Sequence, residues 1–171
     1  PISVAPVIKN EKMTVTFEDL TSEGMGVAKV EGYPLFVADG LPGERATIKV
    51  TKVGKSFGFA RIEERLSSSP DRIPTRDVKG TRVGTMPLQN LRYSAQLAFK
   101  KNNVEQVMKR IAKMPEVEVK PTIGMENPWG YRNKAQIPVR QKDGKLVTGF
   151  FRTNTHELIP MENFQIQDPK I

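Results

Sequence analysis

Cationic and aromatic residues alternate over a short stretch in the first half of the sequence, from Lys49 to Arg65. Lysine and arginine side chains hold phosphates and phenylalanine faces stack on bases, and small β-barrels combine the two on single-stranded RNA. The same spacing would also suit phenylalanines packed in a core beside lysines that only solubilise the surface. The candidate nucleic-acid contacts of this stretch are Lys49, Lys52, Lys55, Phe57 and Arg61, with Phe59 and Arg65 beside them.

A second group of cations lies between Trp129 and Arg140. Arg132, Lys134 and Arg140 fall on alternate positions together with Gln136, so a strand here would present them on one face. Such a face can follow a phosphate backbone and touch a base edge. The exposed polar face of a half-buried sheet would give the same pattern, so both interpretations stay open.

The side chains that most catalytic and metal sites need are missing or rare. The sequence has no cysteine, which excludes disulfides, thiolate metal sites and cysteine nucleophiles. The single histidine, His156, is more typical of a structural hydrogen-bonding residue than of a catalyst. No apolar run approaches the roughly 18 residues of a membrane span, and the N-terminus lacks a signal-peptide core. These features predict a cytoplasmic protein without a membrane partner.

Positive charge dominates the chain and is unevenly spread. The formal net charge is +8 and the pI is about 9.8. Residues 1–44 carry 3 basic and 7 acidic side chains, whereas residues 45–113 carry 16 basic and 5 acidic ones. Clustered cations release counterions from phosphates on binding, so a polyanionic partner is favoured over a merely basic, inert protein.

Short alternating segments separated by glycines occupy the first third of the chain and must position the first group of candidates. Glu31–Gly32 is a plausible tight hairpin turn between two of them. About five strands in about fifty residues is the size of a small closed barrel of the OB or SH3 type. The expected strands cover residues 13–20, 24–30, 33–40, 44–55 and 57–64.

The rest of the chain predicts a linker, a helix and a second sheet. Prolines and serines mark a linker from residue 67, and the polar stretch 75–90 reads as a long loop. Antiparallel strands are expected at residues 117–124, 132–141, 145–153 and 156–162, with Asp143–Gly144 as a hairpin turn. A helix followed by several strands predicts an α+β layer.

Apolar residues at spacings of three, four and seven predict an amphipathic helix over residues 93–113. The apolar positions are Tyr93, Leu97, Val104, Met108 and Ile111. The opposite face holds Lys100, Lys101, Lys109 and Arg110. A solvated helix face is the preferred interpretation of these cations, and a direct nucleic-acid contact is the alternative.

Four segments in this order resemble the N-terminal part of RumA-type RNA (uracil-5-)-methyltransferases. They are "VTFEDLTSEGMGVAKVEGYPLFVADGLPGERATIKVTKVGKSFGFARI", "LQNLRYSAQLAFKKNNVEQVM", "PTIGMENPWGYRNKAQIPV" and "GFFRTNTHELIPMENFQIQ". The resemblance implies a mixed β and α+β fold. An OB-like TRAM RNA-binding β-barrel would occupy residues 1–66, a linker with a degenerate loop residues 67–92, and a central α+β RNA-binding domain residues 93–171.

In that family, four cysteines of the loop and of a downstream segment hold an iron–sulfur cluster. Their positions fall here on Asp77, Val83, Met86 and Phe164, while Asn90 takes the place of a histidine. Because these side chains supply no thiolate, the resemblance implies a branch of the family that lacks the cluster. Three of the four replacements are apolar, so we expect the loop to pack against the segment around Phe164.

The family's S-adenosylmethionine site and catalytic cysteine lie in a C-terminal domain that no stretch of this sequence matches. The resemblance therefore implies an inactive fragment without a cofactor of its own, monomeric and bound to RNA rather than DNA. In the full-length enzyme it would help to form 5-methyluridine in 23S ribosomal RNA, although transfer RNA enzymes share this architecture. The rival interpretation is a complete, non-enzymatic RNA-binding module or RNA chaperone.

Overall fold

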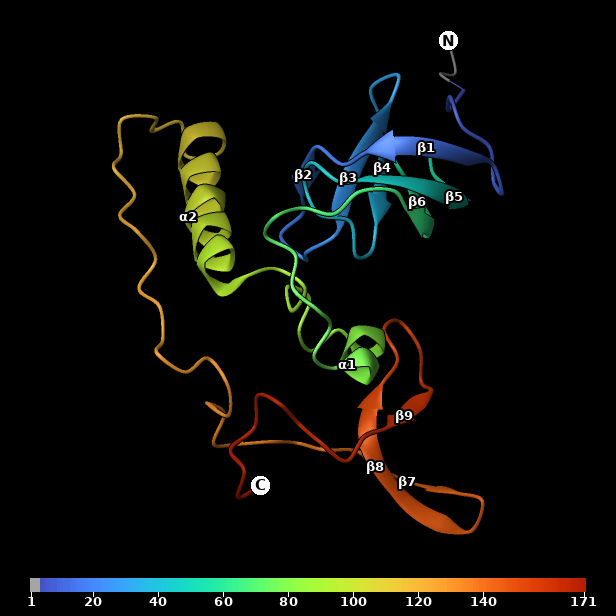
Figure 1. The fold of residues 1–171 in the computed structure, drawn as a ribbon, viewed down its shortest axis with the longest axis vertical. Coiled ribbons are helices and arrows are strands. Elements are labelled where there is room, and N and C mark those ends of the chain that lie inside the picture. The colour runs from blue at the N-terminus through green and yellow to red at the C-terminus, as the bar shows by residue number, and fades with distance from the viewer. Residues whose placement is uncertain (1–3) are drawn as a thin grey trace. The chain divides into compact units, whose positions relative to one another are not determined.

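Six short strands in the first half of the chain form one curled sheet (Figure 1). The computed structural model describes residues 4–171. The order of strands across the sheet is β1-β5-β6-β4-β3-β2, and β4 and β6 pair in parallel while the other neighbours are antiparallel. The strands are β1 (Lys12–Thr16), β2 (Asp19–Leu20), β3 (Gly26–Val30), β4 (Tyr33–Val37), β5 (Arg45–Val53) and β6 (Gly58–Arg65). We call this curled sheet the barrel. It confirms the predicted small OB-like β-fold, but among the described residues the expected closure is absent, because the edge strands β1 and β2 do not pair with each other.

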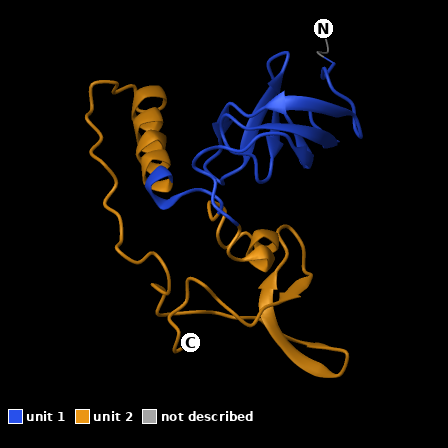
Figure 2. Cartoon of the chain, viewed as in Figure 1, with its two compact units in different colours: residues 1–74, 90–95 blue, residues 75–89, 96–171 orange. Residues whose placement is uncertain are grey.

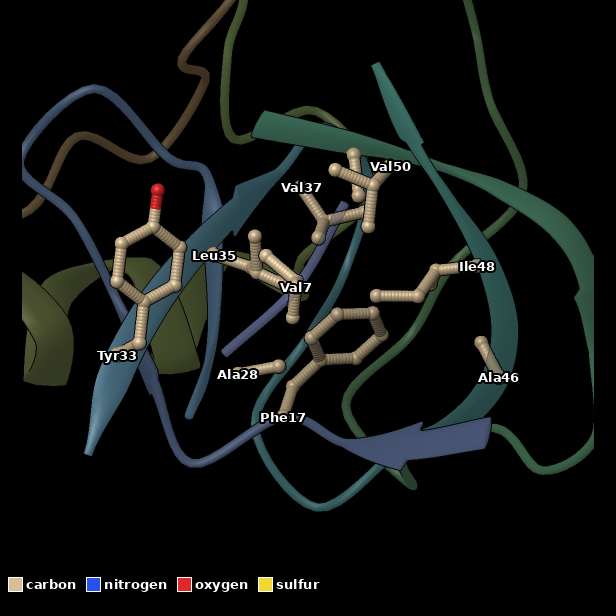
Figure 3. Packing of buried hydrophobic residues seen from close by; sticks show 10 residues of the cluster. Val7, Phe17, Ala28, Tyr33, Leu35, Val37, Ala46, Ile48 and Val50 are labelled. Atoms are coloured by element: carbon tan, nitrogen blue, oxygen red, sulfur yellow. The ribbon is translucent and has the colours of Figure 1, made fainter. Parts of the chain in front are cut away.

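Alternation along the strands decides what fills the barrel. On β4, Tyr33, Leu35 and Val37 are buried, whereas Pro34 and Phe36 on the other face stay partly exposed. Phe17, in the break between β1 and β2, is 1% exposed and packs in the same core (Figure 3). The predicted Glu31–Gly32 turn joins β3 to β4, with φ angles of 50° and 78°.

A charged network fastens the segment after β6 to the barrel. The carboxylate of Glu44 is fully buried and accepts hydrogen bonds from Arg65 Nη1 at 2.7 Å and from Arg72 Nε at 2.7 Å. Asp39 accepts from both arginines, at 2.8 Å and 2.9 Å, and also from Asn90. Arg65 is therefore engaged inside the protein and does not belong to the exposed cations with which the sequence groups it.

Two strand-like segments pair just outside this network and enclose the polar stretch between them. The Ile73 N–H donates to the Asn90 carbonyl at 2.8 Å, and the Arg92 N–H donates to the Asp71 carbonyl at 2.8 Å. The chain divides into two compact units at this point (Figure 2). The first unit runs to Pro74 and includes Asn90–Ala95, and the second comprises Thr75–Gln89 and Gln96–Ile171.

The second unit contains most of the helical structure and a small sheet. The elements are α1 (Val78–Val83), α2 (Tyr93–Arg110, whose first residues belong to the first unit), β7 (Val139–Lys142), β8 (Lys145–Phe151) and β9 (Leu158–Pro160). The three strands pair antiparallel in the order β7-β8-β9. The predicted turn joins β7 to β8, with φ angles of 51° at Asp143 and 77° at Gly144.

Three expectations for this half need correction. Residues 117–124 and 132–138 run as irregular backbone rather than strands, because neither segment finds a neighbouring strand beyond one isolated bridge between Arg132 and Gln167. The polar stretch is not structureless, since it contains α1. The helix predicted over residues 93–113 is confirmed but ends at Arg110. Its apolar stripe is not core, since Val104 is 50% exposed and Ile111, just beyond the helix, is 76% exposed.

Candidate RNA-binding surface and the loop at residues 75–89

Three phenylalanines gather on the outer face of the barrel. Phe36 on β4 and Phe59 on β6 are register partners, and their ring centroids lie 6.0 Å apart. Phe57, just before β6, lies 5.5 Å from Phe36 and 5.8 Å from Phe59. Since Leu35, Val37 and Ala60 alternate with them into the core, these rings point outward. We call Phe36, Phe57 and Phe59 the phenylalanine cluster.

The chain just before β6 holds Phe57 in its exposed position. The Gly54 N–H donates to the Phe57 carbonyl at 2.9 Å, and the Tyr33 hydroxyl donates to the Gly54 carbonyl at 2.9 Å. This tight turn ties the backbone of Phe57 to the barrel while the side chain remains 45% exposed. A fixed, exposed aromatic ring can stack on an unpaired base with little loss of side-chain freedom.

The sheet register places the predicted cations on the same outer face. Lys49 on β5 pairs with Arg61 on β6, and Lys52 pairs with Phe59 across a bulge that follows Val50. Lys55 is exposed in the turn before Phe57. Arg61 is partly neutralised, because its Nε lies 3.1 Å from the Glu63 carboxylate. The register thus brings Lys49, Lys52 and Arg61 to the face that carries the phenylalanine cluster, and Lys55 lies exposed two residues before Phe57.

Sequence reasoning missed Phe36 and left Phe59 undecided between core and surface. The available signal was the alternation in "YPLFV", where Tyr33, Leu35 and Val37 occupy the odd positions. If those three point inward, Phe36 must point outward. Its place beside Phe59, however, depends on the pairing of β4 with β6. That pairing is a parallel contact across the sheet and is not apparent from the neighbouring sequence.

The second group of predicted cations does not share a strand face. Arg132 is exposed and its backbone is held by hydrogen bonds to Ile166 and Asp168, at 2.9 Å and 2.8 Å. Lys134 is exposed in irregular backbone, and Arg140 lies on β7. The expectation of one face that presents all three is therefore wrong, because the chain between them lacks the regular alternation of a paired strand.

The polar stretch 75–89 is held by hydrogen bonds between protein groups. The Asp77 carboxylate caps α1 by accepting from the Gly80 N–H at 2.9 Å, and Gly84 ends the helix with a left-handed φ of 69°. The buried side chain of Gln89 bonds to both the N–H and the carbonyl of Asp77, at 2.9 Å each. Aspartate before and glycine after a short segment are helix-boundary signals that were visible in the sequence.

Residues at three of the four positions that the resemblance aligns with cluster ligands line one small cavity of the second unit. Asp77, Met86 and Phe164 line this space of about 10 Å³, which is the size that a single water needs. Phe164 also meets Phe150 edge-on, with ring centroids 5.5 Å apart. Val83 lies half-buried on α1 and is not among the described residues that line this cavity. The expected packing of the loop against the Phe164 segment thus involves Met86.

These residues do not fit an iron–sulfur cluster. Such a cluster is held by thiolates, and the cavity offers a carboxylate, a thioether and aromatic rings in a chain without cysteine. Within residues 4–171, no group of three or more His, Asp or Glu side chains is placed to hold a metal ion. Among the same residues, no helix is both long and apolar enough to cross a membrane.

Comparison with known proteins places this surface in a domain family. Residues 6–62 match the TRAM domain. A protein of Enterococcus faecalis named as an uncharacterized RNA methyltransferase is 59% identical over 97% of this chain and 36% of its own length. A protein of Lactiplantibacillus plantarum with the same name is 49% identical over the same shares. The chain spans about 36% of the length of these relatives.

One solved structure shares the fold over most of the chain. The tRNA (uracil-54, C5)-methyltransferase of Pyrococcus abyssi, in complex with S-adenosyl-L-homocysteine, aligns with a TM-score of 0.60 at 22% identity. The alignment covers 92% of this chain and 33% of the archaeal one. Residues 6–62, which include most of the barrel, thus match a TRAM domain. Over nearly its whole length the chain is similar to a part of proteins named as RNA methyltransferases.

Proposed function

We propose that this chain is the RNA-binding N-terminal portion of an S-adenosylmethionine-dependent methyltransferase that forms 5-methyluridine in 23S ribosomal RNA. The observation that carries the RNA-binding part is the outer face of the TRAM domain, where three phenylalanine rings lie within 6.0 Å of one another beside cations in register. Rings supply stacking and cations supply phosphate contacts, which together bind unpaired RNA. On this proposal the chain captures and positions RNA, and other parts of the protein carry out the chemistry.

The uracil-5 reaction is supported by the resemblance of the four segments and by a fold neighbour that is, by its title, a tRNA uracil-54 C5 methyltransferase. The ribosomal target rests on the resemblance of the four segments to RumA-type enzymes, since the fold neighbour is by its title a tRNA enzyme. Deletion of the parent gene followed by mapping of 5-methyluridine tests this part. We expect one or more uridines of 23S ribosomal RNA to lose the methyl group while transfer RNA keeps its own. Loss from transfer RNA alone would overturn the ribosomal assignment.

The stacking part is tested by replacing Phe57 with alanine and measuring affinity for an unpaired RNA oligonucleotide by fluorescence anisotropy. Stacking of one base on an aromatic ring is worth about 1–3 kcal/mol, so Phe57→Ala should weaken binding by roughly 5-fold to 100-fold. The dependence of affinity on salt should not change, because no phosphate contact is lost. Ile8→Ala, an exposed apolar side chain of the same unit, is the control and should bind as the wild type does.

The phosphate part is tested by charge reversal at Lys52, which pairs with Phe59 on this face. Lys52→Glu should weaken binding and make it less dependent on salt, by about one unit in the slope of log K against log salt. Lys120→Glu changes the net charge equally in an exposed part of the second unit and serves as the matched control. If Lys52→Glu and Lys120→Glu behave alike, the outer face of the barrel is not the binding surface.

A further inference from the structure

The β7–β8 hairpin carries charges that the barrel surface does not use. β9 pairs with β8 at Gly149–Phe151, and the outer half of β8, Lys145–Thr148, pairs with β7. Every residue of β7 is exposed, as are Lys145, Leu146 and Thr148 of β8. Within the second unit, the turn end of the hairpin extends away from β9 (Figure 1). Both faces of this ribbon are therefore available to a partner.

The two faces of the hairpin differ in charge. The register sets Arg140 opposite Val147 and Lys142 opposite Lys145, so the three cations share one face. The other face carries the uncharged residues Val139, Gln141, Leu146 and Thr148. Asp143, in the turn, is the one carboxylate between residues 139 and 151. We call the face with Arg140, Lys142 and Lys145 the basic hairpin face.

Arg140 is held in place on this face. Its guanidinium lies 5.4 Å from the centre of the Phe151 ring, and its Nη1 donates to the Val139 carbonyl at 3.0 Å. Phe151 also meets His156, with ring centroids 6.4 Å apart. The one aromatic ring of the face is thus covered by a cation and by a second ring. This arrangement fixes the position of the Arg140 guanidinium, and the Phe151 ring is already in contact with Arg140 and His156.

The pairing of Lys142 with Lys145 sets two like charges opposite each other, and Asp143 in the turn supplies one neighbouring carboxylate against the three cations of this face. Like charges directly opposite each other destabilise an antiparallel pair, since the two side chains start only about 5 Å apart. A phosphate bound between the two ammonium groups would turn this repulsion into attraction. A polyanionic partner would be attracted to both ammonium groups at once.

We propose that the basic hairpin face binds the phosphate backbone of a paired RNA stem. This inference rests on the proposed RNA-binding function and adds a second contact of a different kind. The barrel surface offers rings for unpaired bases, whereas the hairpin offers cations without a free ring. Paired RNA is recognised through its shape and its backbone rather than through stacked bases.

The test uses the 171-residue chain, the Lys142→Gln/Lys145→Gln variant and two RNAs of equal length, a stem-loop and an unpaired oligonucleotide. Loss of two phosphate contacts should lower the salt slope for the stem-loop by about two units and weaken its binding. Affinity for the unpaired RNA should stay close to that of the wild type. Because the variant relieves a repulsion, its thermal midpoint should equal or exceed that of the wild type.

Two control variants separate the possible results. Lys109→Gln/Lys113→Gln removes the same charge near the end of α2, and Leu146→Gln alters the opposite hairpin face. If the hairpin variant and the Lys109/Lys113 variant weaken both RNAs equally, only net charge matters and the inference is wrong. Unchanged binding of the stem-loop by the hairpin variant also overturns it. Failure of the wild-type chain to bind either RNA would instead refute the proposed function.

Discussion

The two units of this chain are stabilised in different ways. The barrel surrounds a continuous apolar core and also holds a fully buried carboxylate between two arginines. The second unit buries few large apolar side chains, among them Ile159, Met161 and Ile166, and uses glutamine and aspartate hydrogen bonds to hold its loop. We infer that the barrel resists local opening, whereas the loop and the hairpin of the second unit can open separately.

Removal of the buried carboxylate should have the largest effect. In Glu44→Ala, Arg65 and Arg72 lose a partner to which they bond at 2.7 Å, and the N–H groups of Leu41 and Ser69 lose their acceptor. Breaking a buried ion pair by removing one partner costs about 3 kcal/mol or more. Urea denaturation, monitored by far-UV circular dichroism, measures the loss in the free energy of unfolding.

Glu18→Ala is the matched control for this substitution. The Glu18 carboxylate belongs to an exposed pair with Lys29 at 3.9 Å, and such pairs contribute about 1 kcal/mol or less. A Glu44 variant as stable as the Glu18 variant would show that the network does not hold the barrel together.

The same network predicts an acid-sensitive barrel. Burial opposes ionisation of Glu44, but hydrogen bonds from Arg72, Ser69 and Leu41 outweigh it and lower the pKa of Glu44 below its ordinary value of 4.5. A carboxyl whose pKa is lower in the folded state contributes stability above its unfolded pKa and loses it as pH falls through the folded pKa. Stability should therefore decline below about pH 4.5 in the wild type, as measured by thermal midpoints from pH 7 to 3.

Glu44→Gln separates this carboxyl from the other acidic groups. Its starting stability should be lower, because the amide cannot replace the charge between two arginines. The further decline in acid should be shallower than in the wild type, since one titrating group has been removed. Parallel curves for the two proteins would show that other carboxyls cause the acid sensitivity.

The sequence predicts the barrel better than it predicts the second unit, and the reason is physical. Strict alternation and the turn Glu31–Gly32 are local signals, and each strand meets partners that follow the same rule. Residues 117–124 also alternate, yet alternation gives a strand only where a neighbour accepts its hydrogen bonds. The network around Glu44 joins residues far apart in the chain, so nothing next to Glu44 in the sequence indicates its role.

The candidate surface, too, was only partly predictable from the sequence. Lys49 and Arg61 could be assigned from strand alternation, whereas Lys52 reaches this face only through the bulge after Val50, and the part played by Phe36 depends on a parallel pairing. The cations at Arg132, Lys134 and Arg140 were grouped by spacing alone. Spacing fixes a common face only if the whole segment is a strand, and here only the end at Arg140 is one.

A smaller, local effect is expected from Gln89→Ala. The Gln89 side chain satisfies both backbone groups of Asp77, and its removal leaves a partly buried N–H and carbonyl without these bonds. The cost is about 1–2 kcal/mol, and it should appear as faster hydrogen exchange at the amides of Asp77 and Gly80. Barrel amides should keep their protection. Gln141→Ala, on the exposed hairpin, is the control, and faster exchange throughout the barrel would contradict the separation of the two units.

The smallest effect compares one substitution at two similar turns. Gly32 and Gly144 have φ angles of 78° and 77°, and a Cβ at either position would meet no atom within 4 Å in the described structure. Alanine at each position therefore costs only the backbone strain of a left-handed residue, about 1 kcal/mol. Gly32 lies beside the buried Tyr33, so Gly32→Ala should lower the midpoint of cooperative unfolding.

Gly144→Ala should leave that midpoint unchanged and speed hydrogen exchange at Lys142 and Lys145, which border the turn. Since the basic hairpin face depends on this register, the same variant should weaken binding to the stem-loop RNA and spare the unpaired one. A loss of barrel stability in Gly144→Ala equal to that in Gly32→Ala would mean that the hairpin unfolds together with the barrel. The two proposed RNA contacts would then not be mechanically independent, and a stem bound at the hairpin would stabilise the TRAM surface as well.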